Sequence, residues 1–133
     1  MNKNLTVMLI DDSKLDLYIN YLFVNKIEIA DSILQYESAT KALRFLSETD
    51  YTAWPDLILL DINMPVMNGF EFLEKYNTLP ENAKQKCKII MVSSTLDEGE
   101  ISKANEHPLV LKLLEKPINT KELKKILLQE KII

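Results

Sequence analysis

Five short apolar segments alternate along the chain with stretches in which apolar residues recur every three or four positions. The apolar segments, each typical of a strand, are Leu5–Ile10, Ile33–Glu37, Leu57–Leu60, Lys88–Val92 and Leu109–Leu113. The first, third and fourth are continuous apolar runs, which favours parallel strands covered by helices on both faces. Strands that alternate with helices in this way predict a doubly wound α/β sheet.

The stretches between the strands show the period of an α-helix. Their apolar positions are Leu15, Tyr18, Ile19 and Leu22; Ala39, Ala42, Leu43 and Leu46; Phe70, Leu73 and Tyr76; and Leu123, Ile126 and Leu127. A further helix is predicted after Asp97, because Glu100 follows it by three positions. Asn119 or Thr120 can cap the last helix. Segment Leu79–Lys86 is predicted to be a polar loop, longer than average, that can contain a helical turn.

Composition narrows the class of protein. A length of 133 residues indicates one domain, and 47% hydrophobic with 27% charged residues is ordinary for a globular protein. The net charge of −4, with Arg44 as the only arginine, argues against nucleic-acid binding. Cys87, the only cysteine, is predicted to be a buried small hydrophobe. No apolar stretch reaches the ~18 residues of a membrane span, and we expect no signal peptide. We therefore expect no membrane insertion and a cytoplasmic location.

Polar residues stand at the end of four of the predicted strands. Asp11 and Asp12 follow the first strand, and Asp61 ends the third. Ser93 and Ser94 follow the fourth strand, and Lys116–Pro117 follows the fifth. Because the carboxyl ends of parallel strands share one edge of the sheet, we expect these side chains to meet in one crevice.

This set of residues resembles the receiver domain of two-component response regulators, from about Leu5 to about Gln129. The resemblance implies a flavodoxin-like fold with five parallel strands in the order 2-1-3-4-5 and five helices. We expect residues 1–133 to form this single receiver domain, with no output domain. The resemblance also implies a cis peptide bond between Lys116 and Pro117.

The residue types suit phosphoryl transfer. The Asp61 carboxylate can attack a phosphoryl group to form an aspartyl-phosphate, and neighbouring carboxylates suit Mg²⁺, which prefers oxygen ligands. By resemblance, Asp12, Asp61 and the backbone carbonyl of Asn63 ligate Mg²⁺ directly, and Asp11 contacts a metal-bound water. Lys116 supplies a point charge for a phosphoryl oxygen. Ser93 supplies a hydroxyl donor, for which Ser94 is the competing candidate.

The resemblance implies a phosphoprotein rather than an enzyme, with at most self-phosphorylation from a phosphodonor and slow autodephosphorylation. The expected partners are a sensor histidine kinase or a histidine phosphotransfer protein, and a downstream protein target. Tyr18, Tyr21 and Phe23 are predicted to lie mainly in the core, with part of the stripe left to dock such a partner. Receivers commonly carry an aromatic switch residue three positions before the lysine, where this chain has Leu113. Signalling is therefore expected to repack apolar side chains near Glu98–Leu113.

Three alternatives remain open at this point. A haloacid-dehalogenase-like phosphatase also uses an aspartate nucleophile, but it needs a second Asp where this chain has Asn63, and its acidic pair lies late in the chain. A flavodoxin-like electron carrier needs a phosphate loop where this chain has Asp11 and Asp12. A degenerate receiver would act only as a binding module. His107, the only histidine, is predicted to be exposed in a loop away from the crevice.

Overall fold

A computed structural model describes residues 4–95 and 97–133. Its centre is a five-stranded parallel sheet in the order β2-β1-β3-β4-β5, as predicted. The strands are β1 (Leu5–Ile10), β2 (Ala30–Tyr36), β3 (Leu57–Asp61), β4 (Lys88–Ser93) and β5 (Val110–Glu115). The helices are α1 (Lys14–Lys26), α2 (Ala39–Glu48), α3 (Gly69–Tyr76), α4 (Glu81–Lys86), α5 (Glu98–Glu106) and α6 (Thr120–Gln129), with a 3₁₀ turn η1 (Tyr51–Ala53). No described helix is long and apolar enough to cross a membrane.

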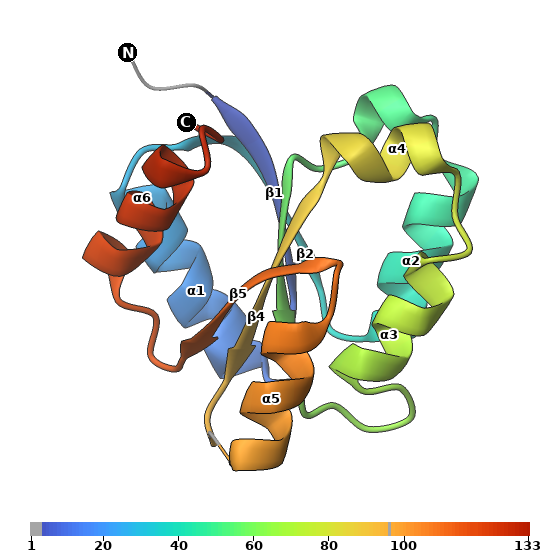
Figure 1. Cartoon of the computed structure of the whole chain (residues 1–133). Helices are drawn as coiled ribbons and strands as arrows, with labels where there is room; N and C mark the ends of the chain where they lie inside the picture. The colour runs from blue at the N-terminus through green and yellow to red at the C-terminus, as the bar shows by residue number, and fades with distance from the viewer. Residues whose placement is uncertain (1–3, 96) are drawn as a thin grey trace.

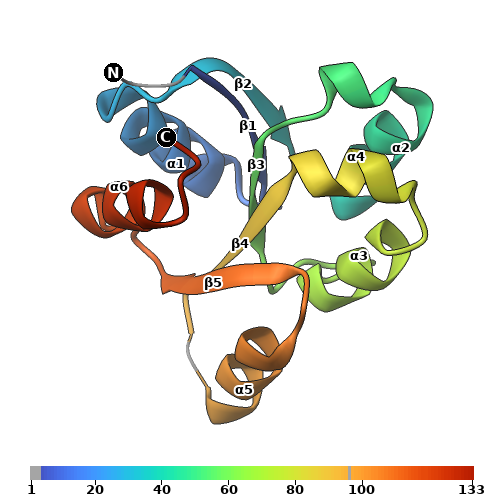
Figure 2. The ribbon, with the colours of Figure 1, turned by 45° about the horizontal axis from the view of Figure 1, so that its top comes forward.

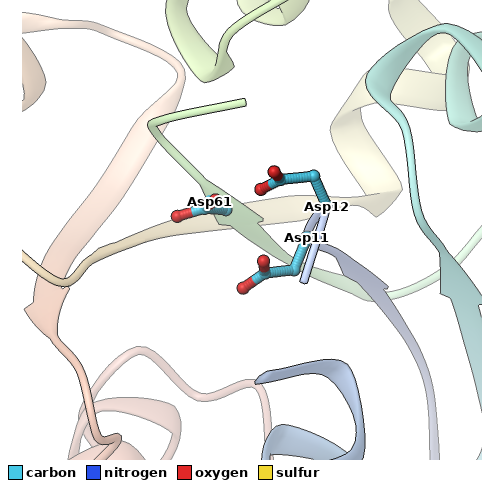
Figure 3. A group of neighbouring side chains, drawn as sticks. All are labelled: Asp11, Asp12 and Asp61. Atoms are coloured by element: carbon cyan, nitrogen blue, oxygen red, sulfur yellow. The ribbon is translucent and has the colours of Figure 1, made fainter. Parts of the chain in front are cut away.

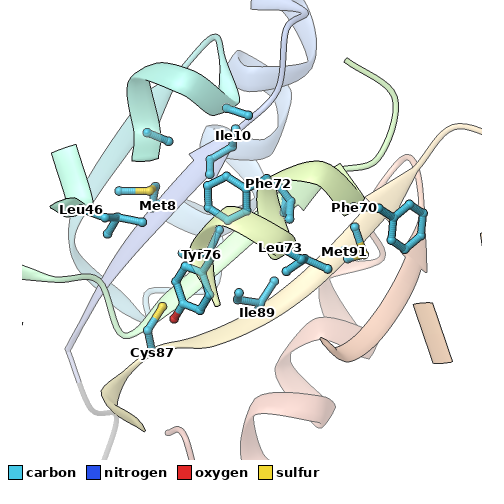
Figure 4. Packing of buried hydrophobic residues seen from close by; sticks show 14 of the residues in the cluster. Met8, Ile10, Leu46, Phe70, Phe72, Leu73, Tyr76, Cys87, Ile89 and Met91 are labelled. Carbon is cyan, nitrogen blue, oxygen red and sulfur yellow. The ribbon is translucent and has the colours of Figure 1, made fainter. Parts of the chain in front are cut away.

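The sheet separates two layers of helices (Figures 1 and 2). Helices α1 and α6 cover one face, and α2, α3, α4 and α5 cover the other. Each face has its own apolar core, since alternate residues of a strand point to opposite sides. Figure 4 shows one core, in which Phe72, Leu73 and Tyr76 of α3 pack against Met8 and Ile89 of the sheet. The central strand β3 is buried along its whole length, as its continuous apolar sequence requires.

The fifth and sixth helices in chain order begin at side-chain caps that the sequence predicts. Asp97 accepts a hydrogen bond from the backbone N–H of Glu100, and Asn119 accepts one from Glu122. Asn119 is therefore the cap of α6, and the alternative, Thr120, is the first residue of the helix. Helix α5 is only lightly attached to the core, because Ala104 is its one buried residue.

The prediction of a loop at Leu79–Lys86 and of five helices was incomplete. Residues Glu81–Lys86 form the short helix α4, which has a single buried residue, Ala83. The Lys86 ammonium donates hydrogen bonds to the carbonyl oxygens of Thr52 and Trp54, at 3.2 and 2.7 Å. These tertiary contacts stabilise a helix that has too few apolar residues to show a helical period.

The apolar stripe of α1 faces solvent rather than the core. Leu15, Tyr18 and Leu22 are 67%, 59% and 44% exposed, whereas Leu17 and Val24 are buried. The prediction that Tyr18 lies mainly in the core was therefore wrong, although Tyr21 and Phe23 are half-buried against it. Both sides of the helix carry apolar residues. Their spacing of three or four positions therefore predicts the helix but not which of its faces is buried.

Candidate functional site

The carboxyl ends of the strands form one crevice, and backbone hydrogen bonds fix its walls. The N–H of Asp11 donates to the Tyr36 carbonyl at 3.1 Å, and that of Ile62 donates to the Val92 carbonyl at 3.1 Å. The N–H of Lys116 donates to the Ser93 carbonyl at 2.8 Å. The residues that end each strand are thus held by the neighbouring strand, which gives their side chains fixed starting points.

Three carboxylates meet in this crevice (Figure 3). Asp11 and Asp12 come from the end of β1 and Asp61 from the end of β3, and one oxygen of each lies within 4.8 Å of the others. Asp11 and Asp61 are buried, while Asp12 is exposed. Hard oxygen donors at this spacing, open to water on one side, fit a Mg²⁺ ion that keeps part of its hydration shell.

Lys116 places its ammonium among the carboxylates, as the position of its strand predicts. Its Nζ lies 2.6 Å from Asp11 Oδ2, 3.0 Å from Asp16 Oδ2 and 3.2 Å from Asp61 Oδ1. Sequence reasoning missed Asp16. The signal in the sequence was weak, because a single acidic residue in the first turn of a helix is common.

Burial and mutual repulsion make the two buried carboxylates, Asp11 and Asp61, hard to ionise. Desolvation by burial raises the pKa of Asp61 from 3.8 to about 6, and the charge of Asp11 adds to it. Burial also raises the pKa of Asp11, although hydrogen bonds from Lys116 and Ser13 oppose the rise. Burial alone would lower the pKa of Lys116, but its hydrogen bonds to Asp11 and Asp16 raise it overall. A cation bound among these carboxylates would favour their charged forms, so ionisation of the site and cation binding are expected to support each other.

Ser93 is fully buried at the end of β4, and its hydroxyl is engaged by the following loop. Its Oγ donates to the carbonyl of Thr95 at 2.6 Å and accepts from the N–H of Thr95 at 3.2 Å. Any role of this hydroxyl toward a ligand in the crevice requires it to leave the Thr95 carbonyl. Ser94, the competing candidate, lines a cavity of about 220 Å³ beside Lys116 and Asp16.

Gly69 begins α3, and close packing explains why no larger residue stands there. A Cβ atom at this position would lie 2.6 Å from the Asp61 carbonyl oxygen and 2.8 Å from Met91 Cε. Its φ is not positive, so close packing, and not a left-handed backbone conformation, accounts for a glycine at this position. The N–H of Gly69 donates to the Ile62 carbonyl at 2.8 Å, which closes the loop next to Asp61.

The loop between β3 and α3 carries Asn63 on its exposed side. Val66, 96% exposed, has φ of 69°, and the N–H of Met67 donates to the Pro65 carbonyl at 2.7 Å. This is a tight turn in a conformation that a β-branched residue rarely adopts.

The remaining sequence predictions concern residues in β5 or next to either of its ends. The Lys116–Pro117 peptide bond is cis, as predicted. Leu113 is half-buried against the core shared with α3. His107 caps the end of α5, at the opposite edge of the sheet from the crevice, and is half-buried rather than exposed. Its Nδ1 accepts a hydrogen bond from the N–H of Leu109 at 3.2 Å.

Comparison with known proteins finds the same architecture in response regulators. A response regulator receiver protein from Dyadobacter fermentans is 34% identical, with a TM-score of 0.85, over 93% of this chain and 95% of that chain. A two-component response regulator from Cytophaga hutchinsonii is 27% identical, with a TM-score of 0.87, over 97% of each chain.

Among curated proteins, the autoinducer 1 sensor kinase/phosphatase LuxN of Vibrio campbellii is 27% identical over 126 residues. These residues make up 95% of this chain but 13% of that protein, so the chain spans only a small part of this relative. The model of the response regulator receiver domain matches residues 7–128. Together with the parallel sheet in the order 2-1-3-4-5, this match shows that the chain belongs to the response regulator receiver domain family of two-component systems.

Proposed function

We propose that this receiver accepts a phosphoryl group on Asp61 in a Mg²⁺-dependent reaction and signals by altered protein binding. The observation that carries the proposal is the position of the Lys116 ammonium, 3.2 Å from Asp61 Oδ1 in a crevice with further carboxylates. An anionic phosphoryl group needs a fixed cation beside the attacking oxygen, and Lys116 is such a cation. The proposed donor is the phosphohistidine of a sensor histidine kinase or a histidine phosphotransfer protein, in the cytoplasm.

In the proposed reaction, an Asp61 carboxylate oxygen forms a bond to phosphorus while the bond to the donor nitrogen breaks. The leaving imidazole takes the electron pair of that bond. Lys116 compensates the charge of the phosphoryl oxygens, and Ser93 donates its hydroxyl to one of them once it releases the Thr95 carbonyl. Asp11, Asp12, Asp61 and the Asn63 carbonyl are the proposed holders of Mg²⁺. When bound, the ion would supply positive charge to the phosphoryl oxygens.

Helix α1 supports the proposed docking of a partner. Leu15, Tyr18 and Leu22 form an exposed apolar stripe, and Asp16 on the same helix contacts Lys116 in the crevice. A helical partner that covers the stripe would bring a phosphohistidine to the edge of the sheet where Asp61 lies.

The proposed output lies on the other side of the crevice. Ser93 ends β4, and the loop that follows leads into α5, which packs against β5. Movement of Ser93 toward a phosphoryl group would pull on this loop, and half-buried Leu113 would repack without the swing of an aromatic ring. The altered surface of α5 and β5 is the proposed contact for a downstream protein.

A haloacid-dehalogenase-like phosphatase is the second candidate, and it is less well supported. Such an enzyme needs a general acid two positions after the nucleophile, and Asn63 has no acidic proton to donate. We propose slow autodephosphorylation as the only hydrolysis.

Labelling tests the proposal. Incubation with acetyl phosphate and Mg²⁺ should add one phosphoryl group to the wild type, detected by intact mass after acid quenching. Asp61→Ala should not be labelled, whereas Asp56→Ala, at the amino end of β3, should be labelled as the wild type is. Full labelling of Asp61→Ala would show that another residue is the acceptor.

A further inference from the structure

Asp16 is a fourth carboxylate at the crevice. It lies in the first turn of α1, where its backbone N–H donates to the Ser13 hydroxyl at 3.1 Å. The Ser13 N–H in turn donates to Asp11 Oδ1 at 3.0 Å. The helix cap therefore fixes Asp16 relative to Asp11, and the two carboxylates together accept two hydrogen bonds from Lys116, at 3.0 and 2.6 Å.

The three carboxylates around Lys116 differ in their access to water. The side chains of Asp11 and Asp61 are 2% and 5% exposed, whereas that of Asp16 is 35% exposed. Asp16 and Lys116 also line the cavity of about 220 Å³ that opens beside α1. Water can therefore replace Lys116 at Asp16, while a released Asp11 or Asp61 carboxylate would remain buried.

We propose that Asp16 is a positioning residue that holds the Lys116 ammonium on the α1 side of the crevice and slows phosphorylation of Asp61. The inference rests on the proposed function. As the Asp61 oxygen bonds to phosphorus and the donor bond breaks, Lys116 must turn hydrogen bonds toward the phosphoryl oxygens. An ammonium has only three N–H groups, so a bond to Asp16 competes directly with a bond to the phosphoryl group.

The test compares rate constants for phosphorylation by acetyl phosphate at saturating Mg²⁺, measured by intact mass. Asp16→Asn keeps the shape of the side chain and removes its charge, so the rate should rise about threefold to fivefold, the range for a partly exposed ion pair. Asp16→Glu keeps the charge and should stay within about twofold of the wild type. Asp31→Asn makes the same change in net charge at an exposed residue near the amino end of the edge strand β2, and should not alter the rate.

The same substitution made in a Lys116→Met protein distinguishes two explanations of a faster rate. Asp16 either positions Lys116 or simply repels the negatively charged phosphodonor. In Lys116→Met the contact is absent, so adding Asp16→Asn should not raise the rate further. An equal increase in that background, or in Asp31→Asn, would overturn the proposal. Equal rates for the wild type and Asp16→Asn would overturn it while leaving the proposed function intact. A wild type that takes no label at all would refute the proposed function, and the inference with it.

Discussion

Replacing Asp61 with asparagine should stabilise the protein when no metal is present. The Asp61 carboxylate is buried beside Asp11, and its pKa is raised from 3.8 to about 6. Asparagine has nearly the same shape and no charge, so it removes the cost of holding a buried anion. Lys116 keeps its two hydrogen bonds to Asp11 and Asp16 in the variant.

The size and sign of the change in unfolding free energy follow from the pKa of Asp61 in the folded state, about 6, and its ordinary value of 3.8 in the unfolded state. Because the folded state holds the proton more tightly than the unfolded state, stability falls as pH rises from about 4 to about 6. A difference of roughly two pKa units corresponds to about 3 kcal/mol of unfolding free energy. Below pH of about 4 the carboxyl is neutral in both states, so the penalty is absent. The full advantage of Asp61→Asn should therefore appear only above pH of about 6.

Urea unfolding in EDTA, followed by the fluorescence of Trp54, measures the difference. Trp54 is the only tryptophan and is 2% exposed, so its emission should report loss of the core. At pH 7.5 the midpoint of Asp61→Asn should exceed that of the wild type by roughly 1 M or more, given the usual dependence on denaturant. Asp31→Asn, an exposed control, should not shift it. A midpoint for Asp61→Asn equal to or below that of the wild type would show that the buried charge is not destabilising.

Further predictions concern the metal and the loop around the crevice. Mg²⁺ should raise the melting temperature of the wild type, because a ligand at 100 Kd adds about 2.7 kcal/mol to the free energy of unfolding. The increase should be smaller for Asp12→Ala. Equal increases for the two proteins would show that the metal binds elsewhere. Gly69→Ala should lower the unfolding free energy by about 1–3 kcal/mol through overpacking against Asp61, whereas Gly99→Ala, in the exposed first turn of α5, should not; unchanged melting of Gly69→Ala would contradict the contact. Val66→Asn should raise the free energy of unfolding by about 1 kcal/mol, because asparagine tolerates positive φ. Val66→Ala should raise it by less. The midpoints of denaturant unfolding measure both effects.

Much of the crevice could be predicted because the ends of buried strands can be recognised in a sequence. An apolar run followed by a polar residue locates the edge of a parallel sheet, which is why Asp11, Asp61 and Lys116 were placed together correctly. Asp16 was missed because one acidic residue on a helix has no distinctive pattern. Its contact depends on a lysine that is 100 positions away in the chain.

The features that were not predicted correctly also depend on contacts between residues that are distant in the sequence. The first residues of β2, such as Asp31 and Ser32, are exposed at the edge of the sheet, so no apolar signal marked where the strand begins. The close packing at Gly69 could not be predicted either, because a sequence does not reveal which atoms approach a residue from elsewhere in the fold. In α1, apolar residues on both faces hid which side packs on the sheet.

Helix α5 touches the core through Ala104 and through the Lys103 ammonium, which lies 4.4 Å from the centre of the Phe70 ring. Most other positions on this helix can therefore change with little effect on folding. Selection on recognition and selection on stability then act on different residues. On the proposed output surface, a lineage could therefore exchange one downstream protein for another by substitutions on α5 alone, and the chemistry proposed for Asp61 would be inherited unaltered.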